Sequence, residues 1–211
     1  MPTIEEARAW YSSADSVHDF DHILRVYHMA ERLAKEENVD LEILRAAALL
    51  HDAVGGAPNS ATRGSHHLIS AEFAGEVLTQ EGWSEERIAT VQHCIRAHRY
   101  RSDGEAPQTI EARILFDADK LDVLGAIGAA RTVAYAAINN QPFYAEPSEK
   151  FVRSGQKEPG EPHSAYHEYL FKLRKIKGIL FTKTARKLAE ARDAYLKEFF
   201  QQLAAEITSE R

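Results

Sequence analysis

Apolar residues recur three and four positions apart along almost the whole chain, and this helical periodicity restricts the fold more than any other feature. The clearest example lies between residues 20 and 37, where the inward positions are Ile23, Val26, Tyr27, Ala30, Leu33 and Ala34. No segment alternates apolar and polar residues over the length of a strand, and no Asn-Gly or Asp-Gly turn joins two β-branched runs. We therefore expect an all-α protein, a bundle of eight to ten helices.

The length of 211 residues fits one domain, residues 1–211. Residues 139–163 hold four of the seven prolines, which predicts a long surface loop or a lid. Two late helices, at about 166–179 and 182–208, would form a C-terminal helical hairpin, residues 164–211, that packs on the core.

The composition is that of an ordinary globular protein, with 44% apolar and 27% charged residues. The formal charge of −6 without a basic block argues against a binder of duplex nucleic acid or of a membrane surface. No apolar run is long enough to cross a bilayer, and the first ten residues lack the features of a secretory signal. Cys94 is the one cysteine, so no internal disulfide can form. We expect a cytoplasmic protein.

Potential metal ligands stand at the edges of apolar helical stripes at His22, at His51-Asp52 and at Asp119. The His-Asp pair is the most informative, because it follows the segment 46–50, which is apolar on every face as a buried helix is. A carboxylate at the end of such a helix is unfavourable unless it is paired or bound to a cation.

Three segments in this order resemble the HD-domain metal-dependent phosphohydrolases. They are His22-Ile23-Leu24-Arg25-Val26, Ala48-Leu49-Leu50-His51-Asp52 and Asp117-Ala118-Asp119-Lys120-Leu121-Asp122. The stretch 119–131 and the region 172–189 are similar to a branch of small bacterial HD hydrolases, so the resemblance spans nearly the whole chain. It implies a helical HD-domain bundle.

The resemblance assigns the metal shell to His22, His51, Asp52 and Asp119. Two imidazoles and two carboxylates form a mixed nitrogen and oxygen donor set, which suits one divalent transition metal: Mn, Fe, Co, Ni or Zn. The family's dinuclear members carry an adjacent histidine pair late in the chain, and this sequence lacks it. We therefore expect one metal, and a second one stays open.

Other residues compete for these roles. His18-Asp19 is a second His-Asp pair, but it lies in a polar stretch at a helix start, where a carboxylate needs no cation. Beside Asp119, we expect Asp117 to cap the following helix and Asp122 to pair with a cation or to orient a ligand.

Four residues are predicted to contact the substrate: Arg25, His66, His98 and Lys120. An arginine binds phosphate through two parallel hydrogen bonds, whereas a lysine acts as a point charge. The two histidines would donate hydrogen bonds to phosphate or water.

The expected reaction is hydrolysis of a phosphoester or phosphoanhydride in a small phosphorylated substrate, with a nucleotide as the first choice. The proton of the attacking water would pass to Asp52 or to Asp122, the two predicted catalytic residues. A phosphodiesterase of the cyclic-nucleotide type is one alternative. A non-catalytic sensor for metal or nucleotide is another, although it predicts a lost ligand. A homodimer is compatible with either.

Overall fold

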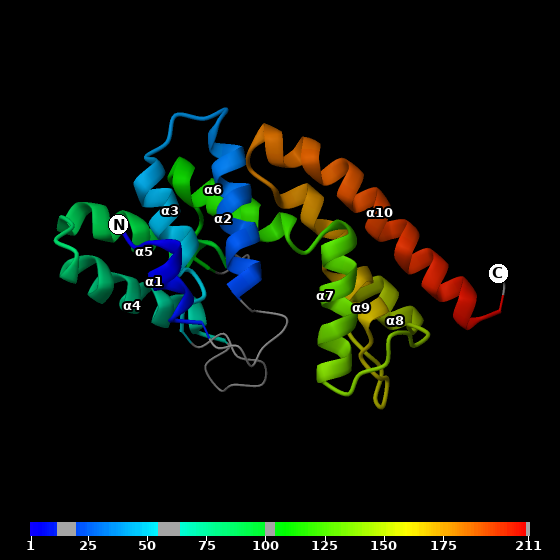
Figure 1. Ribbon diagram of the computed structural model, residues 1–211. Helices are drawn as coiled ribbons and strands as arrows, with labels where there is room; N and C mark the ends of the chain where they lie inside the picture. The colour runs from blue at the N-terminus through cyan, green and yellow to red at the C-terminus, as the bar shows by residue number, and fades with distance from the viewer. Residues whose placement is uncertain (12–19, 55–63, 100–103, 210–211) are drawn as a thin grey trace. The chain divides into compact units, whose positions relative to one another are not determined.

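A computed structural model describes residues 1–11, 20–54, 64–99 and 104–209 of the chain. Within these residues the regular structure comprises ten α-helices and one 3₁₀ helix, and no strand occurs (Figure 1). The expected all-α fold is confirmed.

The chain forms two compact units. The first contains residues 1–119 and 181–185, and the second contains residues 120–180 and 186–211. The long C-terminal helix therefore begins in the first unit and continues in the second.

The centre of the first unit is α3, which contacts four other helices. Asp40 starts α3 by accepting hydrogen bonds from the backbone N–H groups of Glu42 and Ile43, at 3.0 and 3.2 Å. From Ala46 to Leu50 every side chain is fully buried, as the uniformly apolar segment requires. The surrounding helices and α3 have these bounds: α1 (Ile4–Arg8), α2 (Phe20–Ala34), α3 (Leu41–Leu50), α4 (His66–Gln80) and α5 (Glu85–Ala97).

Helices α4 and α5 lie side by side and are joined by a short turn (Figure 1). Gly82 adopts φ +77° in this turn, a conformation that residues with a side chain rarely take. Cys94 lies on the buried face of α5, and burial raises the pKa of its thiol to about 12. It is therefore a packing residue, and its thiol is not activated as a nucleophile.

Helix α6 (Ile110–Leu121) is buried over most of its length, and one buried aspartate on it holds the start of α10 (Lys183–Ile207). Asp117 accepts hydrogen bonds from the backbone N–H of Phe181 at 2.8 Å and from the backbone N–H of Thr182 at 2.7 Å. The Thr182 hydroxyl donates a third at 2.8 Å. The expectation that Asp117 caps the helix that follows it is wrong, because its partners come from a segment more than sixty residues later.

The second unit contains α7 (Gly125–Ile138), α8 (Glu149–Ser154), α9 (Ala165–Phe171), the 3₁₀ helix η1 (Leu173–Ile179) and most of α10. The continuous helix expected at about 166–179 is wrong in one respect: α9 ends at Phe171 and the chain continues with tighter 3₁₀ turns. The proline-rich segment 139–163 contains the short helix α8. Its role as a lid stays a prediction.

Glu161 ties the segment 139–163 together. Its carboxylate accepts hydrogen bonds from the backbone N–H and hydroxyl of Ser148, at 2.8 and 2.7 Å, and from the backbone N–H of Glu158 at 2.6 Å. His167 Nε2 lies 3.1 Å away. The Ser148 N–H contributes most to lowering the pKa of Glu161, which falls to about 2.

Among the described residues, no single helix has both the length and the apolar character needed to cross a membrane. Only α6 and α7 taken together, as a bent pair, meet those criteria.

Substituting Asp117→Asn should lower the free energy of unfolding by about 2 kcal/mol. The substitution replaces one of the two carboxylate oxygens, which accept from the N–H groups before α10, with an amide NH₂ group that can only donate. Denaturant unfolding followed by circular dichroism measures the change. Glu190→Gln, at an exposed position on α10, is the control and should leave stability unchanged. Equal stability of both variants would contradict the capping role.

Substituting Glu161→Gln should lower Tm at pH 7. The difference in Tm between the variant and the unmodified protein should become smaller as the pH falls. A carboxylate whose pKa is 4.5 when unfolded and about 2 when folded contributes stability that is complete above pH 4.5 and is lost toward pH 2. Thermal melts between pH 7 and pH 3.5 measure this gap, again with Glu190→Gln as the control. A gap that does not change with pH would mean that Glu161 acts without its charge.

Candidate metal centre

Six histidine and aspartate side chains from five helices meet in the first unit. They are His22 on α2, His51 and Asp52 at the end of α3, His66 at the start of α4, His98 at the end of α5, and Asp119 on α6. His22, His51 and His98 are buried, and Asp52, His66 and Asp119 are half-buried. His22, for example, lies on the buried face of α2 beside Ile23 and Val26.

His51 is oriented by the backbone of its own helix. Its Nδ1 lies 2.9 Å from the carbonyl oxygen of Ala48, and a carbonyl can only accept, so Nδ1 carries the proton. The Nε2 atom therefore presents a lone pair. This atom is buried and has no hydrogen-bond partner among the described residues, which is the arrangement a metal ligand requires.

The four predicted metal ligands are brought together. His22 Nε2 lies 3.6 Å from Asp119 Oδ1 and 4.0 Å from Asp52 Oδ2, and His51 Nε2 lies 3.7 Å from the same Asp52 oxygen. One ligand atom each from His22, His51 and Asp119 fits within 4.8 Å of the others. These nitrogen and oxygen donors fit a divalent transition metal.

A second group shares the carboxylate of Asp52. Its Oδ1 lies 3.1 Å from His66 Nε2 and 3.5 Å from His98 Nε2, and these three ligand atoms are also within 4.8 Å of one another. Oδ1 is nevertheless buried without an aligned hydrogen bond from any described residue. Asp52 thus faces His22 and His51 with one oxygen and His66 and His98 with the other.

The charge of Asp52 is stabilised by its surroundings. Burial by itself would raise the pKa of this carboxyl, but the nearby rings of His51, His66 and His98 outweigh burial and hold the pKa well below its usual range. Burial also lowers the pKa of His98, against the opposing effect of Asp52. His98 is therefore neutral at neutral pH, as a ligand or a hydrogen-bonding group in this position must be.

Side chains from outside the cluster hold the backbone that carries His51 and Asp52. The Tyr11 hydroxyl donates to the Leu49 carbonyl at 2.8 Å, near the end of α3. The Ser70 hydroxyl accepts from the Val54 N–H and donates to the Val54 carbonyl, both at 3.1 Å. Sequence reasoning missed Tyr11 and Ser70, because each acts through a backbone group far away along the chain.

The predicted substrate and proton-transfer residues lie as follows. Arg25 is half-buried on α2, one turn after His22, and Lys120 is half-buried directly after Asp119. Asp122 is buried in the second unit and accepts a hydrogen bond from Arg131 Nη1 at 2.7 Å. This is the pairing with a cation that the sequence predicts for Asp122.

The rival pair His18-Asp19 lies outside the described residues. Arg99, which sequence reasoning missed, follows His98 and donates hydrogen bonds to the Gly64 carbonyl at 2.5 Å and to His66 Nδ1 at 3.4 Å. Its proximity to His98 in the sequence was the only available signal.

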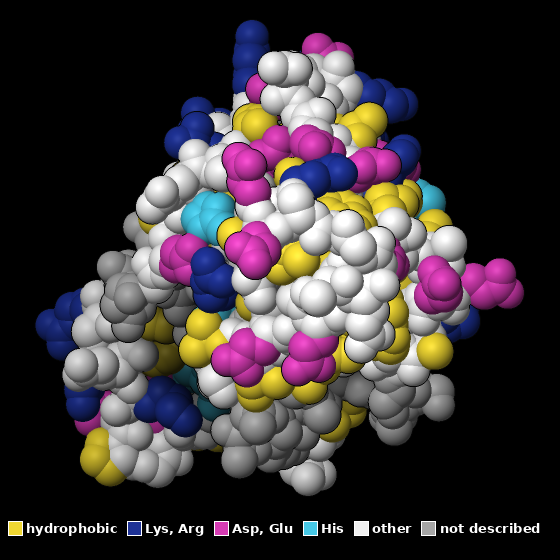
Figure 2. All heavy atoms as spheres, turned by 90° about the vertical axis from the view of Figure 1, so that its left-hand side faces the viewer, with side chains coloured by type: hydrophobic (Ala, Val, Ile, Leu, Met, Phe, Trp, Pro, Cys, Tyr) yellow, Lys and Arg dark blue, Asp and Glu magenta, His cyan; other side chains and the backbone are white. Residues whose placement is uncertain are grey.

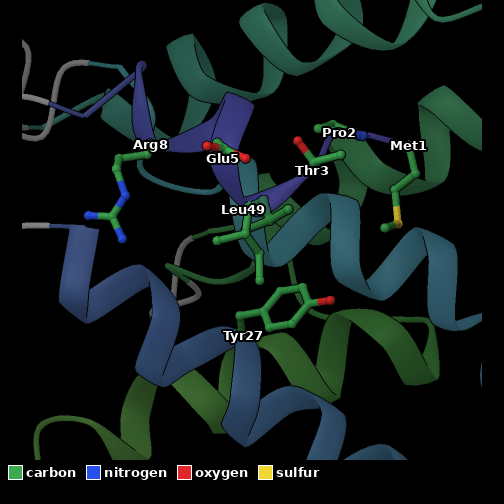
Figure 3. A pocket seen from close by; sticks show the side chains of 8 residues that line it. Met1, Pro2, Thr3, Glu5, Arg8, Tyr27 and Leu49 are labelled. Atoms are coloured by element: carbon green, nitrogen blue, oxygen red, sulfur yellow. The ribbon is translucent and has the colours of Figure 1, made fainter.

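Acidic side chains are spread over the face on which α4 and α5 lie (Figure 2). A separate cavity of about 590 Å³ opens between α1 and the helices α2 and α3 (Figure 3). Its lining residues are Met1, Pro2, Thr3, Ile4, Glu5, Arg8, Tyr27 and Leu49. No residue of the histidine and aspartate cluster is among them, so the cavity and the cluster are distinct features.

Comparison with known proteins identifies the family. Residues 19–124 match the HD domain, and this range contains all six cluster residues. The Bacillus subtilis protein YpgQ is 30% identical over 210 residues, which cover 96% of this chain and 93% of YpgQ. The chain therefore belongs to the HD-domain family.

Solved structures agree with this assignment. The crystal structure of B. subtilis YpgQ in complex with ADP superimposes with a TM-score of 0.73 at 29% identity, covering 97% of this chain and 98% of YpgQ. An HD-superfamily hydrolase from Bacillus thuringiensis gives a TM-score of 0.69 at 29% identity, with 97% of this chain and 94% of that protein covered. The chain is thus similar over nearly its whole length to small bacterial HD proteins.

A divalent metal should stabilise the protein through His22, and the same helix offers a matched control. Mn²⁺ at about 100 times its Kd should raise the free energy of unfolding by about 2.7 kcal/mol. His22→Gln should lose most of this gain, whereas His28→Gln, at an exposed position one and a half turns further on, should keep it. Thermal melts with and without Mn²⁺ measure the difference. An equal metal response in both variants would remove His22 from the ligand set.

Proposed function

We propose that the protein is a metal-dependent phosphohydrolase and that His22, His51, Asp52 and Asp119 hold its metal ion. The observation that carries the proposal is the buried lone pair of His51 Nε2, which has no hydrogen-bond partner among the described residues and lies 3.7 Å from Asp52 Oδ2 where the helices meet. A buried polar atom is costly without a partner, so a site that keeps such a lone pair close to two carboxylates suits a cation.

A divalent metal in this position would lower the pKa of a bound water and neutralise charge on a phosphoryl oxygen. The side chains of the cluster would orient the substrate's phosphoryl group for attack by water. His51 is held by Ala48 and keeps its Nε2 directed at the cluster, while His66 and His98 border the other side of Asp52. A phosphoryl group bound there would lie between the metal ligands and these two histidines, so that water attacks phosphorus and the P–O bond to the leaving group breaks.

The proton released by the attacking water would go to a carboxylate, and the two candidates differ in environment. Asp52 lies in the cluster itself, within 4.0 Å of His22 and His51. Asp122 is already paired with Arg131. The same proton would then pass to the leaving oxygen, which balances the hydrolysis.

A nucleotide is the substrate class that the comparisons support best. The related protein YpgQ crystallised with ADP, and this chain is similar to YpgQ from end to end. Arg25 and Lys120 adjoin His22 and Asp119 along their helices, which makes them the proposed contacts for phosphate oxygens. Either phosphoester or phosphoanhydride cleavage is compatible with this site.

The alternative of a non-catalytic sensor is less well supported, since a degenerate HD protein would have lost at least one ligand and all four are present here. The second group around Asp52 keeps a phosphodiesterase of the cyclic-nucleotide type open, because such an enzyme could use more histidines than the four-residue shell contains.

Substituting Asp52→Asn should abolish metal binding and lower kcat/KM by about 10²-fold or more, because it removes the charge that both groups share. Asp193→Asn on α10 is the control and should behave like the unmodified protein. Metal content is measured by elemental analysis, and turnover is measured with nucleoside mono- and triphosphates and a cyclic nucleotide in Mn²⁺, Co²⁺, Ni²⁺ or Mg²⁺. Full turnover in Asp52→Asn would overturn the proposed mechanism.

The Asp122→Asn variant belongs in the same panel because it tests which carboxylate accepts the proton. If Asp122 is the acceptor, the variant keeps its metal but loses about 10²-fold in kcat together with the acidic limb of the pH–rate profile. If Asp52 is the acceptor, that limb persists.

A further inference from the structure

Arg99 links the end of α5 to the start of α4, next to the candidate metal centre. Its Nη1 atom donates to the Gly64 carbonyl at 2.5 Å and to His66 Nδ1 at 3.4 Å. A guanidinium has only donors, so His66 Nδ1 must be the acceptor in this contact. The proton of a neutral His66 ring is therefore on Nε2, the nitrogen that faces Asp52 Oδ1 at 3.1 Å.

The two neighbouring histidines have the opposite arrangement. His51 Nδ1 donates to the Ala48 carbonyl at 2.9 Å, and His98 Nδ1 donates to the Ile95 carbonyl at 2.5 Å. Their protons are on Nδ1 and their Nε2 atoms present lone pairs to the cluster. Of these three imidazoles beside Asp52, His51 and His98 are ready to ligate a metal and His66 is ready to donate a hydrogen bond.

We propose that Arg99 is a positioning residue that fixes His66 as an Nε2–H donor, so that the group of Asp52, His66 and His98 does not bind a second metal ion. For His66 Nε2 to ligate a metal, its proton would have to move to Nδ1, where it would face the Arg99 N–H. Two donors would then oppose each other. The group would be left with one imidazole and a carboxylate that the first site already uses.

This inference rests on the proposed function and makes it more specific. With its proton on Nε2, His66 would donate to a phosphoryl oxygen of the substrate on the side of Asp52 away from His22 and His51. The protein would then be a one-metal phosphohydrolase in which a histidine takes the place that a second ion could occupy.

The tautomer of His66 can be measured in metal-free protein without substrate. Long-range ¹H–¹⁵N spectra of ¹⁵N-histidine protein distinguish a protonated Nε2 from a protonated Nδ1, and His66→Gln assigns the signals. We expect the Nε2–H form in the unmodified protein and a shift toward the Nδ1–H form in Arg99→Met. Arg99→Lys, which keeps a donor, should restore the Nε2–H form.

Arg96→Met is the matched control, three residues earlier in the chain on α5, because Arg96 pairs with Glu105 instead of with a cluster histidine. It should leave the His66 signals unchanged. A backbone ¹H–¹⁵N spectrum checks that each variant is folded. The same His66 tautomer in folded Arg99→Met as in the unmodified protein would overturn the inference.

Metal stoichiometry is the second measurement. At saturating Mn²⁺, elemental analysis after gel filtration should give one ion per chain for the unmodified protein, Arg99→Lys and Arg96→Met, and two for Arg99→Met. Two ions in the unmodified protein would overturn the inference. Neither measurement uses turnover. If only the proposed hydrolase activity were wrong, the protein would form no product from nucleotides, while its histidine tautomers and metal content would still be as expected.

Discussion

The carboxylate of Asp52 is the constraint on which the rest of the site depends. It is held at the end of α3, whose last five residues are fully buried, so burial disfavours its charge and the negative end of the helix dipole disfavours it further. The surrounding imidazoles more than offset both effects, since the pKa of Asp52 lies well below its usual range. The bundle therefore has to bring histidines from several helices to one oxygen pair, and α3 can supply that pair only because its neighbours cover it on every side.

Most of the cluster residues lie at helix ends. This explains why side chains from elsewhere in the chain form hydrogen bonds to the backbone next to the cluster. The last carbonyls and first N–H groups of a helix lack partners within the helix and must find them elsewhere. Tyr11 provides one for Leu49, and Ser70 provides two for Val54, two residues after Asp52. Arg99 likewise donates to the carbonyl of Gly64, two residues before α4 begins. The residues that satisfy these backbone groups thereby also fix the positions of the cluster side chains.

Sequence patterns were sufficient where the determining interactions are local. The apolar segment before His51-Asp52 predicts a buried helix ending in a carboxylate, and the helical spacing around His22 predicts which face that ring is on. Asp117 could not be assigned in this way, because its partners at the start of α10 are adjacent only in the folded chain. The break between α9 and η1 has no proline or other local signal, so periodicity alone predicted one helix there.

The difference between the histidine tautomers follows from where each ring is located on its helix. His51 and His98 are both the residues that end their helices, so each ring can turn back to an unpaired carbonyl three residues earlier. His66 is the first residue of α4, where the unpaired backbone groups of the helix are N–H donors. Its Nδ1 contacts Arg99, which lies in the turn after α5, and an arginine can only donate. A histidine that begins a helix and one that ends it thus present opposite nitrogen chemistry to the same carboxylate.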